Sequence, residues 1–353
     1  MLKNMRQVLY VFLDLSTKLS VYYLQKGVSL LPRNHPRTRI TSTVSTPLSD
    51  KLSIISDVID LPKSELIDEA LELLVQKYKD RVITSGSKGA SIFMAKTLAF
   101  CSHKGGVGKT TSTACFADLL SKRGYHVLLI DTDSQGNLSK RFGYPPQQHF
   151  EKTLTQLVDD ILSDEPHPVT DFVCATQNKS IDIIPCDDRY AEGVKHMLSA
   201  VMLGINAYKL IVHELSTHYD FIIFDTKPAV DDDVKQVMLA TQWVMIPTDA
   251  ADDSIDGARN TLKFIKAIRR GNPDLAVAGA FFNAVNMRTS VAHDYVPQIR
   301  EAWGPLMFEP IIPYSQDAKK AEGYHAPVSE KYPNGKITRN FSKLVEEVLN
   351  RIG

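Results

Sequence analysis

Short apolar runs alternate with amphipathic stretches along most of the chain after residue 94. Six runs have the length and composition of buried strands: 97–101, 127–130, 181–184, 221–225, 243–246 and 276–282. Apolar residues recur at helical spacing in six further stretches: 111–120, 206–217, 231–241, 254–270, 292–303 and 341–352. Alternation of this kind predicts an α/β domain with a doubly wound, mostly parallel sheet.

A different pattern precedes this region. Residues 39–45 alternate as a short strand does, and 47–59 and 65–78 carry apolar stripes at helical spacing, with Ser64 as a good N-cap. A strand and two helices in about 40 residues bury too little surface to fold alone, so we expect this part to dimerise.

The first 31 residues contain an apolar run at 8–13 behind Lys3 and Arg6. Asp14 and Lys18 end the run well short of the roughly 20 apolar residues that a membrane helix needs. The stretch is either a peripheral helix or upstream sequence that is not always translated, and we assign it no function. The predicted domains are an extension at 1–36, a small module at 37–80, a polar linker at 81–93 and the α/β domain at 94–353.

Composition narrows the functional classes. The 353 residues carry no net charge, so nucleic-acid binding would depend on local basic patches. The four cysteines, at positions 101, 115, 174 and 186, show no zinc spacing and are typical of reduced thiols in a cytosolic protein.

A glycine-rich turn joins the first predicted strand of the α/β domain to its first helix. It reads Lys104-Gly105-Gly106-Val107-Gly108-Lys109-Thr110-Thr111. Glycines let successive backbone N–H groups converge on an anion, and the helix N-terminus adds partial positive charge. In such a loop Lys109 reaches the β- and γ-phosphates and the Thr110 hydroxyl holds Mg²⁺.

The strict pattern GxxxxGK[ST] fails, because His103 stands where its first glycine belongs. The form KGGVGKTT resembles the deviant phosphate loop of ParA/MinD-type ATPases, and the resemblance to ParA/Soj-type partition ATPases covers 94–353. It implies a P-loop NTPase fold, ATP and Mg²⁺ as cofactors, and ATP hydrolysis to ADP and phosphate. It also implies that Lys104 reaches across a dimer interface to the partner's nucleotide.

Three carboxylates follow predicted strands, where an open α/β sheet places its ligand crevice. Asp225 ends an apolar run in the Walker B arrangement, which holds Mg²⁺ through its water shell. The stretch DTDSQGN resembles the family's D-x-D-x-Q-x-N motif, so that Asp133 positions the attacking water and Asp131 supports the metal. By the same resemblance Pro313 lies in the segment that lines the adenine.

One position departs from the family pattern. Where relatives carry a proline pair after the Walker B aspartate, this chain has Thr226-Lys227-Pro228. Lys227 either faces solvent or brings a cation to the nucleotide or dimer face.

Residues 37–80 resemble CopG-type ribbon–helix–helix modules, in which two strands pair across a dimer and enter the major groove. By that resemblance Arg39, Thr41 and Thr43 face base edges, while Lys63 meets phosphate. The alternative is a small dimerisation element with a solvated basic strand. In the ATPase domain Arg300 and Lys336 fall where relatives place DNA-contacting residues.

The leading hypothesis is a plasmid or chromosome partition ATPase, cytoplasmic and nucleoid-associated, that does not bind membranes. It would dimerise on ATP, bind DNA and hydrolyse ATP when stimulated by a centromere-binding, ParB-like partner. Two alternatives are a MinD-like positioning ATPase on membranes and a nucleotide-switched regulator of its own operon.

Overall fold

The computed structural model describes residues 94–148, 151–201, 206–229, 231–251 and 253–353, together with scattered positions between 52 and 70. The chain divides into two units, residues 1–94 and 95–353. In the first unit Lys63 is exposed and helical. The Leu66 N–H donates to the Pro62 carbonyl at 3.3 Å, as in a first helical turn. Arg39, Thr41 and Thr43 lie outside the described residues.

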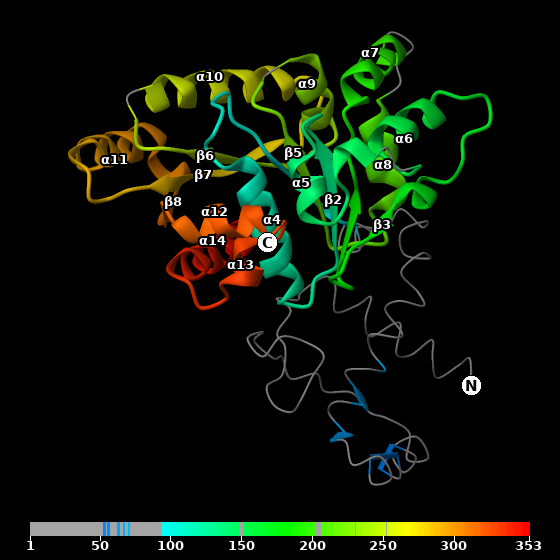
Figure 1. Ribbon diagram of the computed structural model, residues 1–353, viewed down its shortest axis with the longest axis horizontal. Helices are drawn as coiled ribbons and strands as arrows, with labels where there is room; N and C mark the ends of the chain where they lie inside the picture. The colour runs from blue at the N-terminus through cyan, green and yellow to red at the C-terminus, as the bar shows by residue number, and fades with distance from the viewer. Residues whose placement is uncertain are drawn as a thin grey trace. The chain divides into compact units, whose positions relative to one another are not determined.

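Eight strands of the described residues form one sheet in the second unit (Figure 1). Their order across the sheet is β3-β4-β2-β5-β1-β6-β7-β8, and every neighbouring pair is parallel except β3 with β4. The strands are β1 (Lys96–Phe100), β2 (Val127–Thr132), β3 (Cys174–Ala175), β4 (Ile181–Ile184), β5 (Phe221–Thr226), β6 (Trp243–Thr248), β7 (Ala276–Val285) and β8 (Met307–Pro313). The predicted doubly wound, mostly parallel sheet is confirmed.

Helices cover both faces of this sheet (Figure 1). One face carries α6 (Leu154–Ile161), α7 (Tyr190–Val201), α8 (Ala207–Leu215), α9 (Asp232–Leu239), α10 (Asp253–Ile268) and α11 (Ser290–Trp303). The other carries α4 (Lys109–Ser121), α12 (Gln316–Gly323), α13 (Val328–Lys331) and α14 (Lys336–Ile352). The short α5 (Asn137–Arg141) follows β2.

Alternation along the strands explains the two-sided core. Successive side chains of a strand point to opposite faces, so a sheet covered on both faces needs continuous apolar runs. In β1, Leu98 and Phe100 pack toward α4 and α14, whereas Ala99 packs on the opposite face. The rings of Phe100 and Phe116 meet edge-on with centroids 5.1 Å apart, which fastens α4 to the sheet.

The chain order predicts a ligand site beside β1. After β1 the chain builds one half of the sheet through β2, β3 and β4, adds β5 next to β1, and then continues outward on the other side through β6. Reversal of this kind opens a crevice at the carboxyl ends of the central strands. The glycine-rich turn, the DTDSQGN stretch and Asp225 all lie at these ends.

Candidate functional site

The glycine-rich turn runs directly into the N-terminus of α4. Gly108 is the N-cap and takes a left-handed conformation with φ 79°, and Gly106 has φ 76°. Within the described ranges no side chain caps this helix and no acidic residue lies in its first turn. The first backbone N–H groups of α4 and its positive dipole end are therefore available to an anion.

The side chain of Asn283 on β7 clamps this turn by hydrogen bonds to its backbone carbonyls. Its Nδ2 donates to the Val107 carbonyl at 2.7 Å and to the Gly108 carbonyl at 3.3 Å. A Cβ on Gly108 would lie 2.2 Å from that nitrogen, so glycine is required here for space as well as for its backbone angle. From the sequence, Asn283 is expected only at a strand end on the nucleotide side, and its contact with the turn is not predicted.

The two lysines of the turn differ in environment. Lys109 is buried, and its Nζ lies 3.5 Å from the Lys104 carbonyl. Burial lowers the pKa of Lys109, and the negative charge of Asp225 opposes that shift. Lys104 is partly exposed, and its Nζ lies 2.8 Å and 3.1 Å from the two carboxylate oxygens of Asp249, which follows β6.

Asp225 and Asp131 are register partners on the neighbouring strands β5 and β2. Burial, followed by repulsion from Asp131, raises the pKa of Asp225 to about 8, and a hydrogen bond with Thr110 opposes the rise. Its Oδ1 accepts from the Thr113 hydroxyl at 3.3 Å, whereas its buried Oδ2 has no hydrogen-bond partner among the described residues.

Both carboxylate oxygens of Asp131 accept hydrogen bonds from the segment that follows β2. Its carboxylate accepts from the Asp133 N–H at 3.1 Å and from the N–H and hydroxyl of Ser139 at 2.8 Å and 2.7 Å. Burial still raises the pKa of Asp131. Asp133 is partly exposed and accepts from the Gln135 N–H at 3.0 Å. Asp131 therefore shapes the loop that presents Asp133.

These groups fit a magnesium ion bound together with a nucleotide. Within the described part of the chain, no three His, Cys, Asp or Glu side chains gather into a metal site of their own. Mg²⁺ usually binds to one or two protein oxygens together with substrate phosphates and water. The orphaned Oδ2 of Asp225 beside the Thr110 hydroxyl matches that need.

Lys227 is paired with carboxylates, whereas the sequence left open whether it faces solvent or brings a cation to the nucleotide or dimer face. Its side chain is 26% exposed, and its Nζ lies 2.8 Å from Asp231 and 3.2 Å from Asp233. Asp233 is buried and also accepts from the Tyr190 and Tyr208 hydroxyls, at 2.9 Å and 2.8 Å. The lysine thus ties the segment after β5 to the start of α9.

Three other predicted site residues lie outside this centre. Pro313 ends β8 and is partly exposed. The Arg300 guanidinium donates to the carbonyls of Phe308 and Glu309, at 3.3 Å and 2.7 Å, and therefore fastens α11 to β8. Lys336 is exposed in the first turn of α14.

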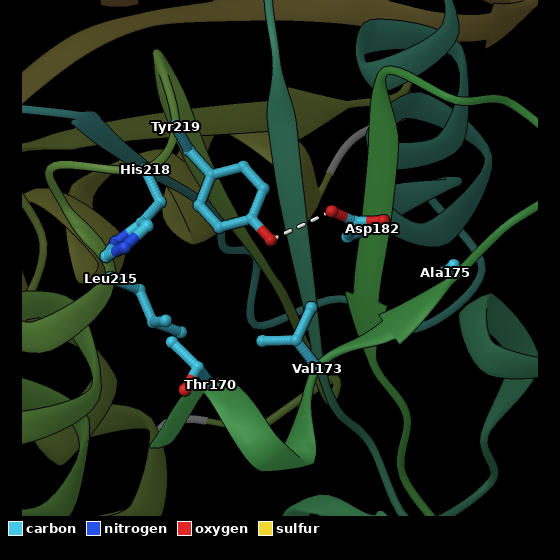
Figure 2. Close-up of a pocket in the computed structure, with 7 residues that line it drawn as sticks. All are labelled: Thr170, Val173, Ala175, Asp182, Leu215, His218 and Tyr219. Carbon is cyan, nitrogen blue, oxygen red and sulfur yellow. Dashed lines mark hydrogen bonds between the residues drawn. The ribbon is translucent and has the colours of Figure 1, made fainter. Parts of the chain in front are cut away.

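A separate hollow of about 270 Å³ lies at the other end of the sheet (Figure 2). Asp182, near the start of β4, accepts a hydrogen bond from the Tyr219 hydroxyl at 2.9 Å, and Val173 and Leu215 contribute apolar walls. Since the strands are parallel, this amino-end hollow is remote from the glycine-rich turn. It takes no part in the site described above.

Comparison with known proteins agrees with this geometry. The family profile described as "AAA domain" matches residues 95–277, which is more than half of the chain, and the "Ribbon-helix-helix domain" profile matches 36–79. The chromosome-partitioning ATPase Soj of Treponema pallidum is 28% identical over 261 residues, which cover 74% of this chain and 99% of that protein. The chromosome partitioning protein ParA of Caulobacter vibrioides is 26% identical over 72% of this chain and 94% of its own length.

This chain belongs to the ParA/Soj-type ATPases. It is therefore an ATPase, and it carries an N-terminal ribbon–helix–helix domain.

Solved structures of ParA-like proteins share the fold. An ATP complex of a Cyanothece McdA variant superposes with a TM-score of 0.62 at 25% identity, covering 73% of this chain and 97% of that one. MinD from Pyrococcus horikoshii, solved with Mg-ADP, gives a TM-score of 0.61 at 23% identity over 74% of this chain and 98% of that one. No helix of the described ranges is long and apolar enough to cross a membrane.

Proposed function

We propose that the protein is a DNA partition ATPase whose active site is the crevice at the carboxyl ends of β1, β2 and β5. The main observation in support is that Lys109, Asp225 and Asp133 lie together at the N-terminus of α4. Among the described residues, no side chain caps that helix end. The ParA/Soj family membership supports segregation of DNA as the task. The proposed modules are 37–80 and 94–353, joined by 81–93.

The proposed nucleotide ligands are the residues of the turn and the helix that follows it. Backbone N–H groups of 105–108 and α4 bind the phosphates, Lys109 neutralises the β- and γ-phosphates, and Thr111 adds its hydroxyl. Pro313 lies against the adenine. Thr110 and Asp225 hold Mg²⁺, which supplies charge neutralisation at the phosphates when bound, and Asp131 supports that shell through the loop.

Hydrolysis requires orientation of a water molecule more than covalent chemistry. Asp133 projects from a loop that Asp131 and Ser139 hold in place, and its charge acts on Lys109. We assign Asp133 the task of orienting the attacking water. Lys109 stabilises the negative charge that develops on the transferred phosphoryl group.

Lys104 gives the site a second, dimer-dependent cation. In the single chain its ammonium group is paired with Asp249 at the crevice, and the side chain is 35% exposed. We propose that two ATP-bound copies meet across their crevices, and that each Lys104 then contacts the nucleotide of its partner. The enzyme is thus a homodimer in its active state.

DNA binding is assigned to two surfaces. The ribbon–helix–helix domain, with Arg39, Thr41, Thr43 and Lys63, would read a specific site. The exposed stripe Lys336, Arg339 and Lys343 on α14 would bind DNA without sequence preference. Arg300 is not part of this stripe, because its guanidinium is engaged with β8.

The DNA-binding proposal is tested by salt dependence. Removal of one lysine–phosphate interaction lowers the slope of log K against log salt by about one. Replacing the whole α14 stripe by alanine should lower that slope by about three for the ATP-bound protein, and Lys343→Ala alone by about one. Lys209→Ala, an exposed lysine on α8, is the control and should leave the slope unchanged. Equal slopes for all variants would remove α14 from the DNA interface.

The active-site proposal is tested by ATP turnover. Lys109→Ala and Asp133→Ala should each lower turnover by roughly a hundredfold or more. Asp182→Asn changes a carboxylate on β4 at the amino end of the sheet and should leave turnover within twofold (Figure 2). Undiminished turnover in both active-site variants would refute the assignment.

A centromere-binding, ParB-like partner is proposed to stimulate this turnover, and the protein is proposed to act in the cytoplasm on the nucleoid.

The ribbon–helix–helix match also favours a second function as a nucleotide-switched regulator of its own operon. If Arg39→Ala abolishes operator binding while plasmid retention persists, the two duties are separable. The membrane-associated alternative is disfavoured, since the apolar face of α14 is buried on the sheet.

A further inference from the structure

Arg141 is a buried cation beside the glycine-rich turn. It ends α5, only 5% of its side chain is exposed, and its Nη2 donates to the Thr111 hydroxyl at 3.1 Å. Because a guanidinium stays protonated at any physiological pH, the chain keeps a permanent positive charge in its interior here.

That charge is poorly compensated by the protein. Within the described residues its one ion pair is with Glu322 of α12 at 3.7 Å, and the glutamate side chain is 62% exposed, where solvent screens it. Its Nη1 is buried and lacks a hydrogen-bond partner in the part of the chain that the structure describes. The adjacent N-terminus of α4 is itself positive, so the two together favour a bound anion.

The hydroxyl between Arg141 and the turn indicates where that anion binds. The Ser112 hydroxyl donates to the Gly108 carbonyl at 2.8 Å, and the Thr113 hydroxyl is shared between the Lys109 carbonyl at 3.1 Å and Asp225 at 3.3 Å. The Thr111 hydroxyl instead accepts from Arg141, and a guanidinium can only donate. The proton of Thr111 is therefore directed to another acceptor, at the third residue of α4, where the backbone N–H also lacks an intrahelical partner.

We propose that Arg141 is a positioning residue for the nucleotide's phosphate chain, acting through the Thr111 hydroxyl and through its own charge. This inference rests on the proposed nucleotide site. The phosphate concerned is one that ADP and ATP share, because Lys109 is assigned to the β- and γ-phosphates and Lys104 to the nucleotide of the partner. Arg141 thus contributes equally to binding of both nucleotides and little to the hydrolytic step.

Because the charge of Arg141 is poorly compensated, it should lower the stability of the nucleotide-free protein and strengthen nucleotide binding. Without nucleotide, the buried charge of Arg141 destabilises the fold, so replacing it by an apolar side chain of similar length should leave the melting temperature unchanged or raise it. With nucleotide, the same replacement removes a charge-assisted hydrogen-bond network and weakens binding. If Arg141 had only a structural role, the same replacement would lower the melting temperature and leave nucleotide affinity unchanged.

The test compares Arg141→Met, Arg141→Lys and Glu322→Gln in the full-length protein with Mg²⁺. Isothermal titration with ADP and with a non-hydrolysable ATP analogue should show roughly tenfold weaker binding of both by Arg141→Met. Arg141→Lys should recover part of that affinity, and Glu322→Gln should bind as the unaltered protein does. Turnover of Arg141→Met at saturating ATP should stay within about threefold of the unaltered rate.

Several outcomes would overturn the inference. They are ADP affinity of Arg141→Met within twofold of the unaltered protein, weaker binding confined to the ATP analogue, or a nucleotide-free Arg141→Met protein that melts lower or does not fold. Lys109→Ala separates this failure from failure of the site itself. If Lys109→Ala loses nucleotide affinity while Arg141→Met keeps it, only the role of Arg141 is refuted.

Discussion

Asp131 and Asp225, on the adjacent strands β2 and β5, differ in how their carboxylate oxygens are hydrogen-bonded. Asp131 has both oxygens hydrogen-bonded within its own loop, whereas Asp225 keeps one buried oxygen without a partner among the described residues. A buried, unsatisfied carboxylate oxygen costs stability and is retained where a ligand needs it. We therefore assign the proposed metal-binding role to Asp225, and Asp131 acts on the loop.

This difference predicts a pH effect on the metal-free protein. An unfolded aspartate has a pKa near 4 and folded Asp225 has a pKa of about 8, so between these values the folded chain binds more protons. The free energy of unfolding consequently falls as pH rises through this window. We expect the free energy of unfolding of the unaltered protein to fall by a few kcal/mol more than that of Asp225→Asn between pH 5 and pH 8. Urea unfolding in the presence of a chelator measures this, and parallel profiles for the two proteins would contradict it.

Asn283 provides a second test at the scale of single residues. Asn283→Ala removes the two hydrogen bonds that hold the Val107 and Gly108 carbonyls. We expect the free energy of unfolding to fall by about 1–2 kcal/mol and ADP binding to weaken several-fold, because the loop is less preorganised. Asn350→Ala, an exposed position on α14, serves as the control and should change neither quantity. Unchanged ADP affinity in Asn283→Ala would show that the clamp does not matter for binding.

The residues of the phosphate-binding turn and Asp225 were predictable from the sequence, but the side chains that contact the turn from elsewhere in the chain were not. The turn at 104–111 and Asp225 follow from a local pattern, since glycine, lysine and carboxylate requirements act within a few residues. Asp249, Asn283 and Arg141 meet that turn only after the sheet has assembled, at separations of 145, 176 and 30 residues. Periodicity carries no information on such long-range hydrogen bonds.

Strands and helices with strong patterns were predicted well. The predicted strand at 181–184 coincides with β4, and the run at 221–225 gives β5 with one residue more. β8 was missed as a strand because its two prolines, Pro310 and Pro313, argue against a central strand. Its place at the sheet edge, which only the topology reveals, accommodates them.

The last helix tests the packing of one whole face. Leu344 is fully buried where α14 covers the sheet, and its neighbour Lys343 points outward. Leu344→Ala should lower the free energy of unfolding by about 2–5 kcal/mol, because a cavity remains where the side chain was. Lys343→Ala should change it by less than about 0.5 kcal/mol. Denaturant melts of both variants decide the matter, and a small effect of Leu344→Ala would place α14 outside the core.

At the scale of the whole molecule, the proposed assembly is controlled by the bound nucleotide. The single chain pairs Lys104 with Asp249, so the proposed dimer would exchange that ion pair for an interaction with the partner's nucleotide. This exchange becomes favourable only when a triphosphate supplies the negative charge that Asp249 otherwise provides. Dimerisation should therefore respond to ATP and not to ADP.

The most direct measurement is sedimentation of the purified full-length protein with Mg²⁺ and a non-hydrolysable ATP analogue. Because we expect the ribbon–helix–helix domain to pair chains on its own, the comparison is with ADP at the same protein concentration. The account predicts a tighter or larger assembly with the ATP analogue than with ADP for the unaltered protein, and no difference between the two nucleotides for Lys104→Ala. Identical sedimentation of the unaltered protein in both nucleotides, with both shown to be bound, would contradict it.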